Sequence, residues 1–288
     1  MCPNGDKDMH ERFNFPIAIL LLVISTLALA CSLLHPKRAN GWHVTLEIDL
    51  HAPDRAVAAE KTVAIIESRL NALGIVNSKV QVHGITSNGR ILVSLPDVPD
   101  RERLKKLITE EGRLEIAAVV SPPSPAPLKT YKTKEEALAS LGGTVPPNRR
   151  VLSYGEQNGK VAGVSNAGEA RKLKKWVVLE SPPIVDDSGL RNASAVKSST
   201  GADDYQIAFS LTQSAADKFG AWTGAHVNDY IGVILDKDVK SIAFIKSQIS
   251  DKGEISGRFT KQSAEDLSKI LISGALPAPV KIVEEGSN

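Results

Sequence analysis

The sequence predicts an α+β fold with one N-terminal transmembrane helix, followed by two strand-and-helix units and a last strand that pairs with an earlier one. Three observations predict it. Residues 15–34 are almost wholly apolar and carry no charge. Residues 42–120 switch repeatedly between strand-like and helix-like periodicity. Residues 280–284 form a last apolar strand, which needs a partner from earlier in the chain.

Length and charge set the first limits on function. A chain of 288 residues has room for two domains of ordinary size. The net charge of +2 argues against a nucleic-acid binder, which needs a strong basic field. A basic run at residues 171–175 is interpreted as a solvated helix face, with a contact to anionic lipid or protein as the alternative. Cys2 and Cys31 both precede residue 42, so the rest of the chain can form no disulfide.

The apolar run from Phe15 to Leu34 has the length of a bilayer-spanning helix. We expect an uncleaved membrane anchor. A cleaved signal peptide is the main alternative, because residues 28–30 read Ala-Leu-Ala. A buried soluble helix and a lipoprotein processed at Cys31 are weaker alternatives. Basic residues are balanced on the two sides of the run, so the charge pattern leaves its orientation open.

The first unit reads as strand, helix, strand, strand, helix, strand. An Asn-Gly pair at residues 88–89 predicts a hairpin, and Asp100 is a good cap for the second helix. This order is typical of a ferredoxin-like domain, an antiparallel sheet with both helices on one face. The expected elements are strands at 42–50, 79–85, 90–95 and 114–120, and helices at 54–73 and from 100 to 111.

The middle of the chain is harder to interpret. Residues 121–127 (Ser-Pro-Pro-Ser-Pro-Ala-Pro) predict a stiff, extended linker. A second Asn-Gly pair at residues 158–159 predicts a small hairpin, and residues 176–179 predict a buried strand. Pro182 and Pro183 then mark another boundary.

The second unit begins near residue 184. Thr212 and Thr260 each precede an apolar stripe at helical spacing, so we expect both to be helix N-caps. Gly274 stands where a helix ends, and Pro277 and Pro279 cannot continue that helix. The expected strands cover residues 205–211, 230–235, 239–245 and 255–259.

No motif in the sequence carries catalytic chemistry, a cofactor or a metal. It has no phosphate-binding glycine loop, no zinc-protease helix motif and no nucleophile elbow. His43 and His51 share a strand face, but eight strand residues separate them by about 26 Å, too far to share a metal. We therefore expect a protein that is not an enzyme, with no catalytic, cofactor-binding or metal-binding residues.

Short segments in both units stand in the order of a known family. In the first unit they are residues 69–75 (Arg-Leu-Asn-Ala-Leu-Gly-Ile), 80–81, 90–96 and 112–115 (Gly-Arg-Leu-Glu). In the second unit they are residues 234–236, 255–260 (Ile-Ser-Gly-Arg-Phe-Thr) and 274–280 (Gly-Ala-Leu-Pro-Ala-Pro-Val). These segments resemble the first periplasmic domain of the SecD protein-export family, over most of residues 42–285.

The resemblance implies an architecture and a location. Residues 42–120, completed by 276–285, would be a ferredoxin-like base, and 121–183 would be a linker and variable insert. Residues 184–275 would be an α+β head inserted into the base. Residues 1–14 would be a cytoplasmic tail. The chain would cross the bacterial inner membrane once, with its large C-terminal part in the periplasm. Implied partners are translocating polypeptide, Sec translocase components such as SecY or SecF, and membrane lipid through one helix.

The sequence departs from the family in two places. The family's glycine-rich segment after the first membrane helix is replaced by Arg-Ala-Asn-Gly-Trp at residues 38–42. The later membrane helices, which carry the family's proton path, have no counterpart in the 288 residues. The leading hypothesis is therefore a membrane-anchored module that binds emerging polypeptide without its own proton-driven motor. The alternative is a structural partner of a membrane complex that binds no export substrate.

Such a module would bind polypeptide in a groove between base and head, opened by hinges. The candidate hinge residues are Pro182, Pro183, Leu276, Pro277 and Pro279, because prolines interrupt both helices and strands. The alternative reading of Pro277 and Pro279 is that they are ordinary edge-strand residues.

Overall fold

The computed structural model describes residues 41–49, 55–84, 89–121, 127–155, 174–199 and 204–287. The predicted anchor from Phe15 to Leu34 and the tail at 1–14 lie outside the described residues. So do His51, Asn88, most of the proline linker and the Asn-Gly pair at 158–159. Within the described ranges, none of the helices has the length and apolarity that a membrane span requires.

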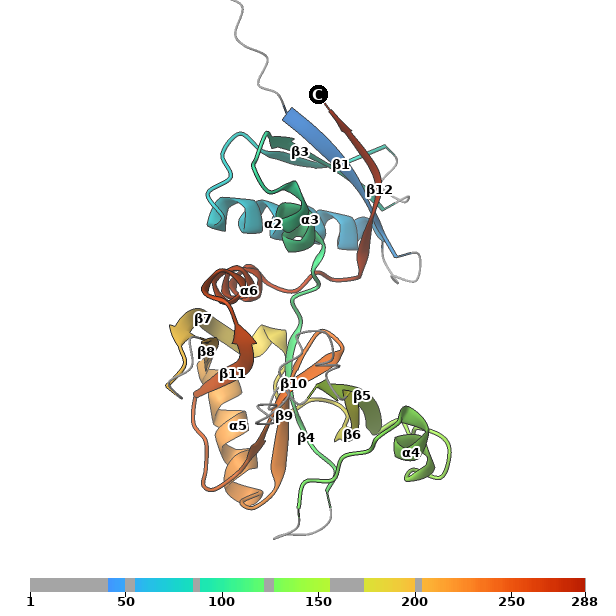
Figure 1. Cartoon of the computed structure of the whole chain (residues 1–288), viewed down its shortest axis with the longest axis vertical. Helices are drawn as coiled ribbons and strands as arrows, with labels where there is room; N and C mark the ends of the chain where they lie inside the picture. Colours follow the sequence, from blue (N-terminus) through green and yellow to red (C-terminus); the bar gives the residue numbers. More distant parts are fainter. Residues whose placement is uncertain are drawn as a thin grey trace, which may run out of the picture.

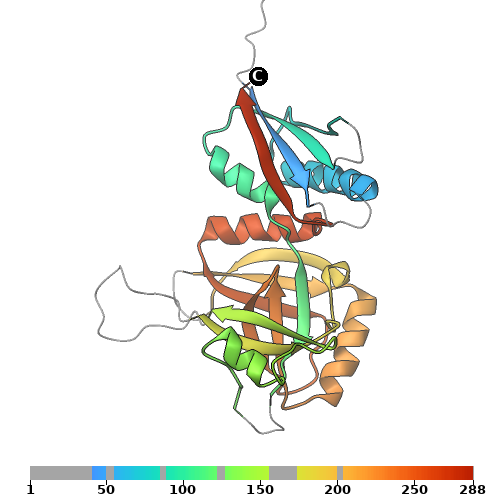
Figure 2. The ribbon, with the colours of Figure 1, turned by 90° about the vertical axis from the view of Figure 1, so that its right-hand side faces the viewer.

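Two bodies are stacked along the long axis of the molecule (Figures 1 and 2). The base is a four-stranded antiparallel sheet in the order β12-β1-β3-β2 with helices α2 and α3. The head contains the other two sheets and the helices α4, α5 and α6. The base elements are β1 (Gly41–Ile48), α2 (Arg55–Ala72), β2 (Lys79–Val82), β3 (Arg90–Pro96), α3 (Arg101–Thr109) and β12 (Val280–Ser287).

The base has a core because alternate strand residues and one stripe of each helix are apolar. Figure 1 shows α2 and α3 below the sheet, on the same side of it. Trp42, Val44, Leu46 and Ile48 of β1 are all buried in this core, as is Leu104 of α3. The sheet order is that of a ferredoxin-like domain in which β12 takes the place of the last strand.

The final strand returns to the base, as the family resemblance implied. β12 pairs antiparallel with β1, from Ile48 opposite Val280 to Trp42 opposite Ser287. The start of β1 and the end of β12 therefore lie side by side, at the end of the molecule farthest from the head (Figures 1 and 2).

The assignment of residues 114–120 to the base is wrong. β4 (Leu114–Ala118) leaves the base and pairs antiparallel with β9 in the head, with Leu114 opposite Leu235. The reason is that β4 is buried on both faces. Ile116 lies in one apolar cluster of the head, and Ala117 and Val119 lie in another. A strand with two buried faces fits a place between the two apolar clusters of the head, whereas the base sheet has helices on one face alone.

The head's larger sheet has five strands in the order β4-β9-β10-β5-β6. A bridge between Val119 and Leu179 brings the two edge strands together, so the sheet curls around the core formed by Ala117, Val177 and Ile234. β5 and β6 were predicted to lie in a variable insert, but both belong to this sheet. Its other elements are α4 (Lys134–Ala139), β5 (Arg149–Gly155), β6 (Lys174–Glu180), β9 (Tyr230–Leu235) and β10 (Asp238–Phe244).

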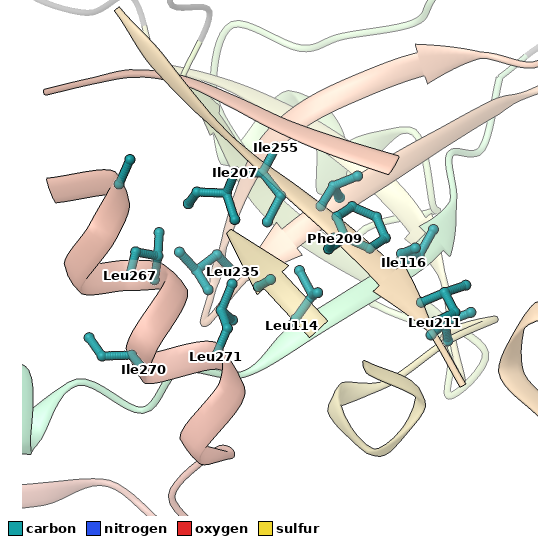
Figure 3. Close-up of a cluster of buried hydrophobic side chains, with 14 of the residues drawn as sticks. Leu114, Ile116, Ile207, Phe209, Leu211, Leu235, Ile255, Leu267, Ile270 and Leu271 are labelled. Carbon is teal, nitrogen blue, oxygen red and sulfur yellow. The ribbon is translucent and has the colours of Figure 1, made fainter. Parts of the chain in front are cut away.

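The smaller sheet of the head has the order β11-β8-β7 and packs with α5 and α6 around the largest apolar cluster. Figure 3 shows Leu271 of α6 pointing toward Ile207 of β8 and Leu235 of β9. The predicted caps are confirmed: Thr212, Thr260 and Asp100 each accept a backbone N–H three residues on. The elements are β7 (Leu190–Lys197), β8 (Tyr205–Leu211), α5 (Gln213–Ala225), β11 (Lys252–Phe259) and α6 (Lys261–Ser273).

Candidate functional site

The chain crosses between base and head at two adjacent segments, residues 110–113 on the way out and 274–276 on the way back. We call these two segments the neck. They are joined directly, because Leu276 donates its backbone N–H to Glu111 O at 2.9 Å. Arg113 adds a longer contact from its Nη2 to Leu276 O at 3.5 Å. The two crossings therefore form one structural joint.

Arg69 of α2 holds the neck together. Its side chain is fully buried. Nη1 donates to Leu107 O at 3.1 Å and to Glu110 O at 2.6 Å. Nη2 donates to Glu111 O at 3.0 Å and to Gly274 O at 3.1 Å. One planar guanidinium thus ties the end of α3 and both crossings to α2, and we refer to this arrangement as the Arg69 staple.

Burial shifts the titration of the groups around the staple. It lowers the pKa of Arg69 to about 10, while the charges of Asp236 and Glu110 act in the opposite direction. The guanidinium therefore stays protonated at neutral pH. Burial also raises the pKa values of the Glu110 and Asp236 carboxyl groups. The charge of Asp236 raises the pKa of Glu110 further, and the charge of Glu111 raises that of Asp236. The fold thus holds the charged groups of Arg69, Glu110 and Asp236 partly or fully out of water at the neck.

Asp236 connects the neck to the head. It lies in the β9–β10 turn with a left-handed φ of 58°. Its Oδ1 accepts the backbone N–H of Arg113 at 2.8 Å, and its own N–H donates to Arg113 O at 2.8 Å. Gly112 makes this approach possible, because it has a φ of +75° and a side chain there would collide with Ile270 and crowd Arg69.

The structure separates the five candidate hinge residues into two groups. Leu276 lies in the neck and is buried in the base core, and Pro277 and Pro279 follow it on the way into β12. Pro182 and Pro183 lie inside the head, directly before Ile184, whose N–H donates to Ile116 O of β4 at 2.8 Å. The two groups therefore lie at different places in the fold, and the prolines at 182 and 183 are not at the crossing between base and head.

An apolar cleft opens on the base beside the neck. Its volume is about 230 Å³, and it lies between the end of α2, the β3–α3 loop and α3. Its two charged lining residues both have partners: Asp100 caps α3, and Arg103 pairs with Asp266 of α6. The lining is otherwise apolar and consists of Leu73, Ile75, Val98, Pro99, Leu104 and Leu107.

Two other hollows lie along α5 of the head, and both are lined largely by polar and small side chains. Across the described ranges, no three His, Cys, Asp or Glu side chains lie together as metal ligands would. The apolar cleft and the neck are therefore the features that best fit a site for binding and movement.

Reasoning from the sequence missed Arg69 and Asp266. Both stand next to apolar stripes of their helices, where a charged residue is rarely buried without a partner. That position was a usable signal of buried charge, although it does not name the partner.

Two family models match the chain. The SecDF P1 head subdomain matches residues 162–278, and the N-terminal part of the P1 domain of protein translocase subunit SecDF matches residues 59–121.

Curated relatives match over most of the chain. A protein translocase subunit SecD from Koribacter versatilis is 37% identical over 232 residues, covering 81% of this chain and 39% of that protein. One from Aquifex aeolicus is 31% identical over 225 residues, covering 78% and 38%. The chain thus spans about two fifths of the length of these relatives.

Solved structures share the fold. A crystal structure of SecDF in a super-membrane-facing form matches with a TM-score of 0.62 at 22% identity, over 94% of this chain and 35% of that one. A structure described as a membrane component SecDF that enhances protein export matches with a TM-score of 0.59 at 23% identity, over 84% of this chain and 98% of that one.

Proposed function

The chain belongs to the SecD/SecDF family of protein translocase subunits through its P1 region, and from this premise we propose that it assists protein export by holding polypeptide that emerges from the translocation channel. The names of the relatives denote transport and no catalytic activity. The proposed location is the periplasmic face of the bacterial inner membrane, with a single anchor from Phe15 to Leu34 and a cytoplasmic N-terminus. Sec components such as SecY or SecF are the proposed neighbours.

The apolar cleft is the observation that carries this proposal. A polypeptide in transit is unfolded and presents apolar side chains that have no core to enter. The six apolar residues of the cleft offer such side chains a place out of water, without a charged group that lacks a partner. Since the chemistry of the cleft is non-directional, it suits many different sequences, as an export factor requires.

Binding of a permanently unfolded polypeptide to the purified chain tests the proposal. The probe is a fluorescently labelled, reduced and carboxymethylated protein, and the readout is fluorescence anisotropy. Val98→Asp puts a charge into the cleft and should weaken binding about tenfold, which corresponds to about 1.4 kcal/mol. Val145→Asp is the matched control, because Val145 is 42% exposed in the head and lies outside the cleft.

Two results would contradict the proposal. One is equal affinity of the Val98→Asp and Val145→Asp variants, measured at unchanged unfolding midpoints. The other is no binding by the unsubstituted chain, which would favour the alternative function of a structural partner in a membrane complex.

A further inference from the structure

Helix α6 is the head element that faces the base. It lies across the junction below α2 and α3 (Figures 1 and 2). Ala264, Leu267 and Leu271 turn one side of the helix into the head core. Asp266 is on the other side, where it reaches α3 of the base. The position of α6 relative to α2 and α3 therefore sets the position of the head.

The C-terminal end of α6 has a fixed attachment. Gly274, the residue that ends the helix, gives its carbonyl oxygen to the Arg69 staple. Arg69 is fully buried, and it donates to four carbonyl groups, of which Glu111 O also accepts the N–H of Leu276. Breaking this contact would leave a buried guanidinium short of acceptors, which is strongly unfavourable. This end of α6 is expected to act as a pivot.

The middle of α6 has a different attachment. Arg103 donates from Nε to Asp266 Oδ2 at 2.8 Å and from Nη2 to Oδ1 at 2.6 Å, a bidentate pair. Gln262 also donates to Asp266 Oδ1, at 3.1 Å. The Arg103 side chain is 38% exposed, so its guanidinium can exchange this carboxylate for water. The ion pair therefore has favourable bidentate geometry, but its exposure to water allows it to break.

The part of α6 between the two attachments can act as a lever. Asp266 precedes Gly274 by eight residues, which is about 12 Å of helix. Arg103 also lines the apolar cleft, together with Leu73 and Leu107, which pack toward the head core. A tilt of α6 about its C-terminal end would therefore separate Asp266 from Arg103, at the side of the cleft that Arg103 lines.

We propose that the Arg103–Asp266 ion pair is a releasable latch between base and head, and that the Arg69 staple is the pivot about which the head tilts when the latch opens. This inference goes beyond polypeptide binding and does not depend on it, because it concerns the position of the head in the chain alone.

Pulsed electron–electron distance measurements test the latch. Spin labels are placed on Lys61 of α2 and Lys218 of α5, both exposed, in the full chain with Cys2 and Cys31 replaced by serine. Arg103→Glu sets two carboxylates against each other and should shift the base–head distances to longer, broader values. The charge-swapped double variant Arg103→Glu/Asp266→Arg should restore the original distribution, which a general loss of stability would not do.

The control reverses a charge on the same helix without touching the base. Lys261 pairs with Glu265 within α6 at 3.9 Å, so Lys261→Glu should leave the base–head distances unchanged. The latch is overturned if Arg103→Glu and Lys261→Glu give the same distribution as the unsubstituted chain. It is equally overturned if the swapped double variant stays as broad as Arg103→Glu while its unfolding midpoint is normal. Neither result would bear on the anisotropy test of binding.

Discussion

At the scale of the residue, Arg69 shows how one side chain can unite segments that are far apart in sequence. Its guanidinium reaches from α2 to Leu107 and Glu110 at the end of α3, and to Gly274 at the end of α6. Backbone carbonyls and the nearby charges of Asp236 and Glu110 offset the cost of its burial. Such a residue is costly to replace, since its own guanidinium is buried and its four acceptors lie partly or wholly out of water.

Arg69→Met should destabilise the chain by about 3–5 kcal/mol, the usual cost of removing one side of a buried charged contact. The methionine keeps the bulk but removes the guanidinium donor from all four carbonyls, of which Glu111 O keeps the N–H of Leu276. Chemical denaturation of the chain measures the change. Arg90→Met is the control: Arg90 is 49% exposed and pairs with Glu47, so it should cost no more than about 1 kcal/mol. Equal losses of unfolding free energy in the two variants would show that the Arg69 staple stabilises the chain no more than an exposed ion pair does.

At the scale of the element, β12 joins the base from farther along the sequence than any other base strand or helix. It enters the sheet about two hundred residues after α2, yet it pairs with β1 along its whole length. Without it, β1 would become an edge strand with a row of open hydrogen-bonding groups. The base therefore reaches its complete sheet only after the head has been made.

Removal of residues 280–288 should release β1 while sparing the head. Amide hydrogen exchange read by mass spectrometry should show lost protection in β1, and retained protection in β4 and β9, which pair with each other in the head. Glu285→Gln is the control, since it removes only the ion pair with Lys105 at 3.0 Å. Unchanged protection of β1 after the truncation would mean that β12 does not stabilise the base.

The same elements show how far the sequence could predict the structure. β8 and β9 were predicted with the bounds that the structure has, because alternation and a continuous apolar run are local signals. The return of β12 to the base followed from the family resemblance and not from a local pattern. The partner of β4 was not, because the choice between an edge of the base and the middle of the head depends on which cores lie nearby, and no local pattern encodes that.

The site was less predictable than the fold for a similar reason. The prolines drew attention as possible hinges because proline has a strong local effect. The residues that join base and head, Arg69, Arg103 and Asp266, are ordinary helical residues until the fold brings them together. The hinge roles of Pro182, Pro183, Leu276, Pro277 and Pro279 stay predictions.

At the scale of the whole molecule, the two ends of the described part and the head lie at opposite ends of the long axis (Figure 1). If the chain is anchored through its N-terminus, the base stands next to the membrane and the head projects away from it. The apolar cleft and the neck then lie between the membrane and the head. An emerging polypeptide would pass close to the neck, which positions the head.

The most direct test of the central claim is photo-crosslinking to an export substrate arrested in the channel. A photoreactive amino acid replaces Val98 in the cleft in one variant, and Val145 on the outside of the head in another. The account predicts a strong crosslink from position 98 that disappears when the arrested substrate is released, and little or none from position 145. Equal labelling from both positions, or a crosslink at 98 that does not depend on the substrate, would contradict it.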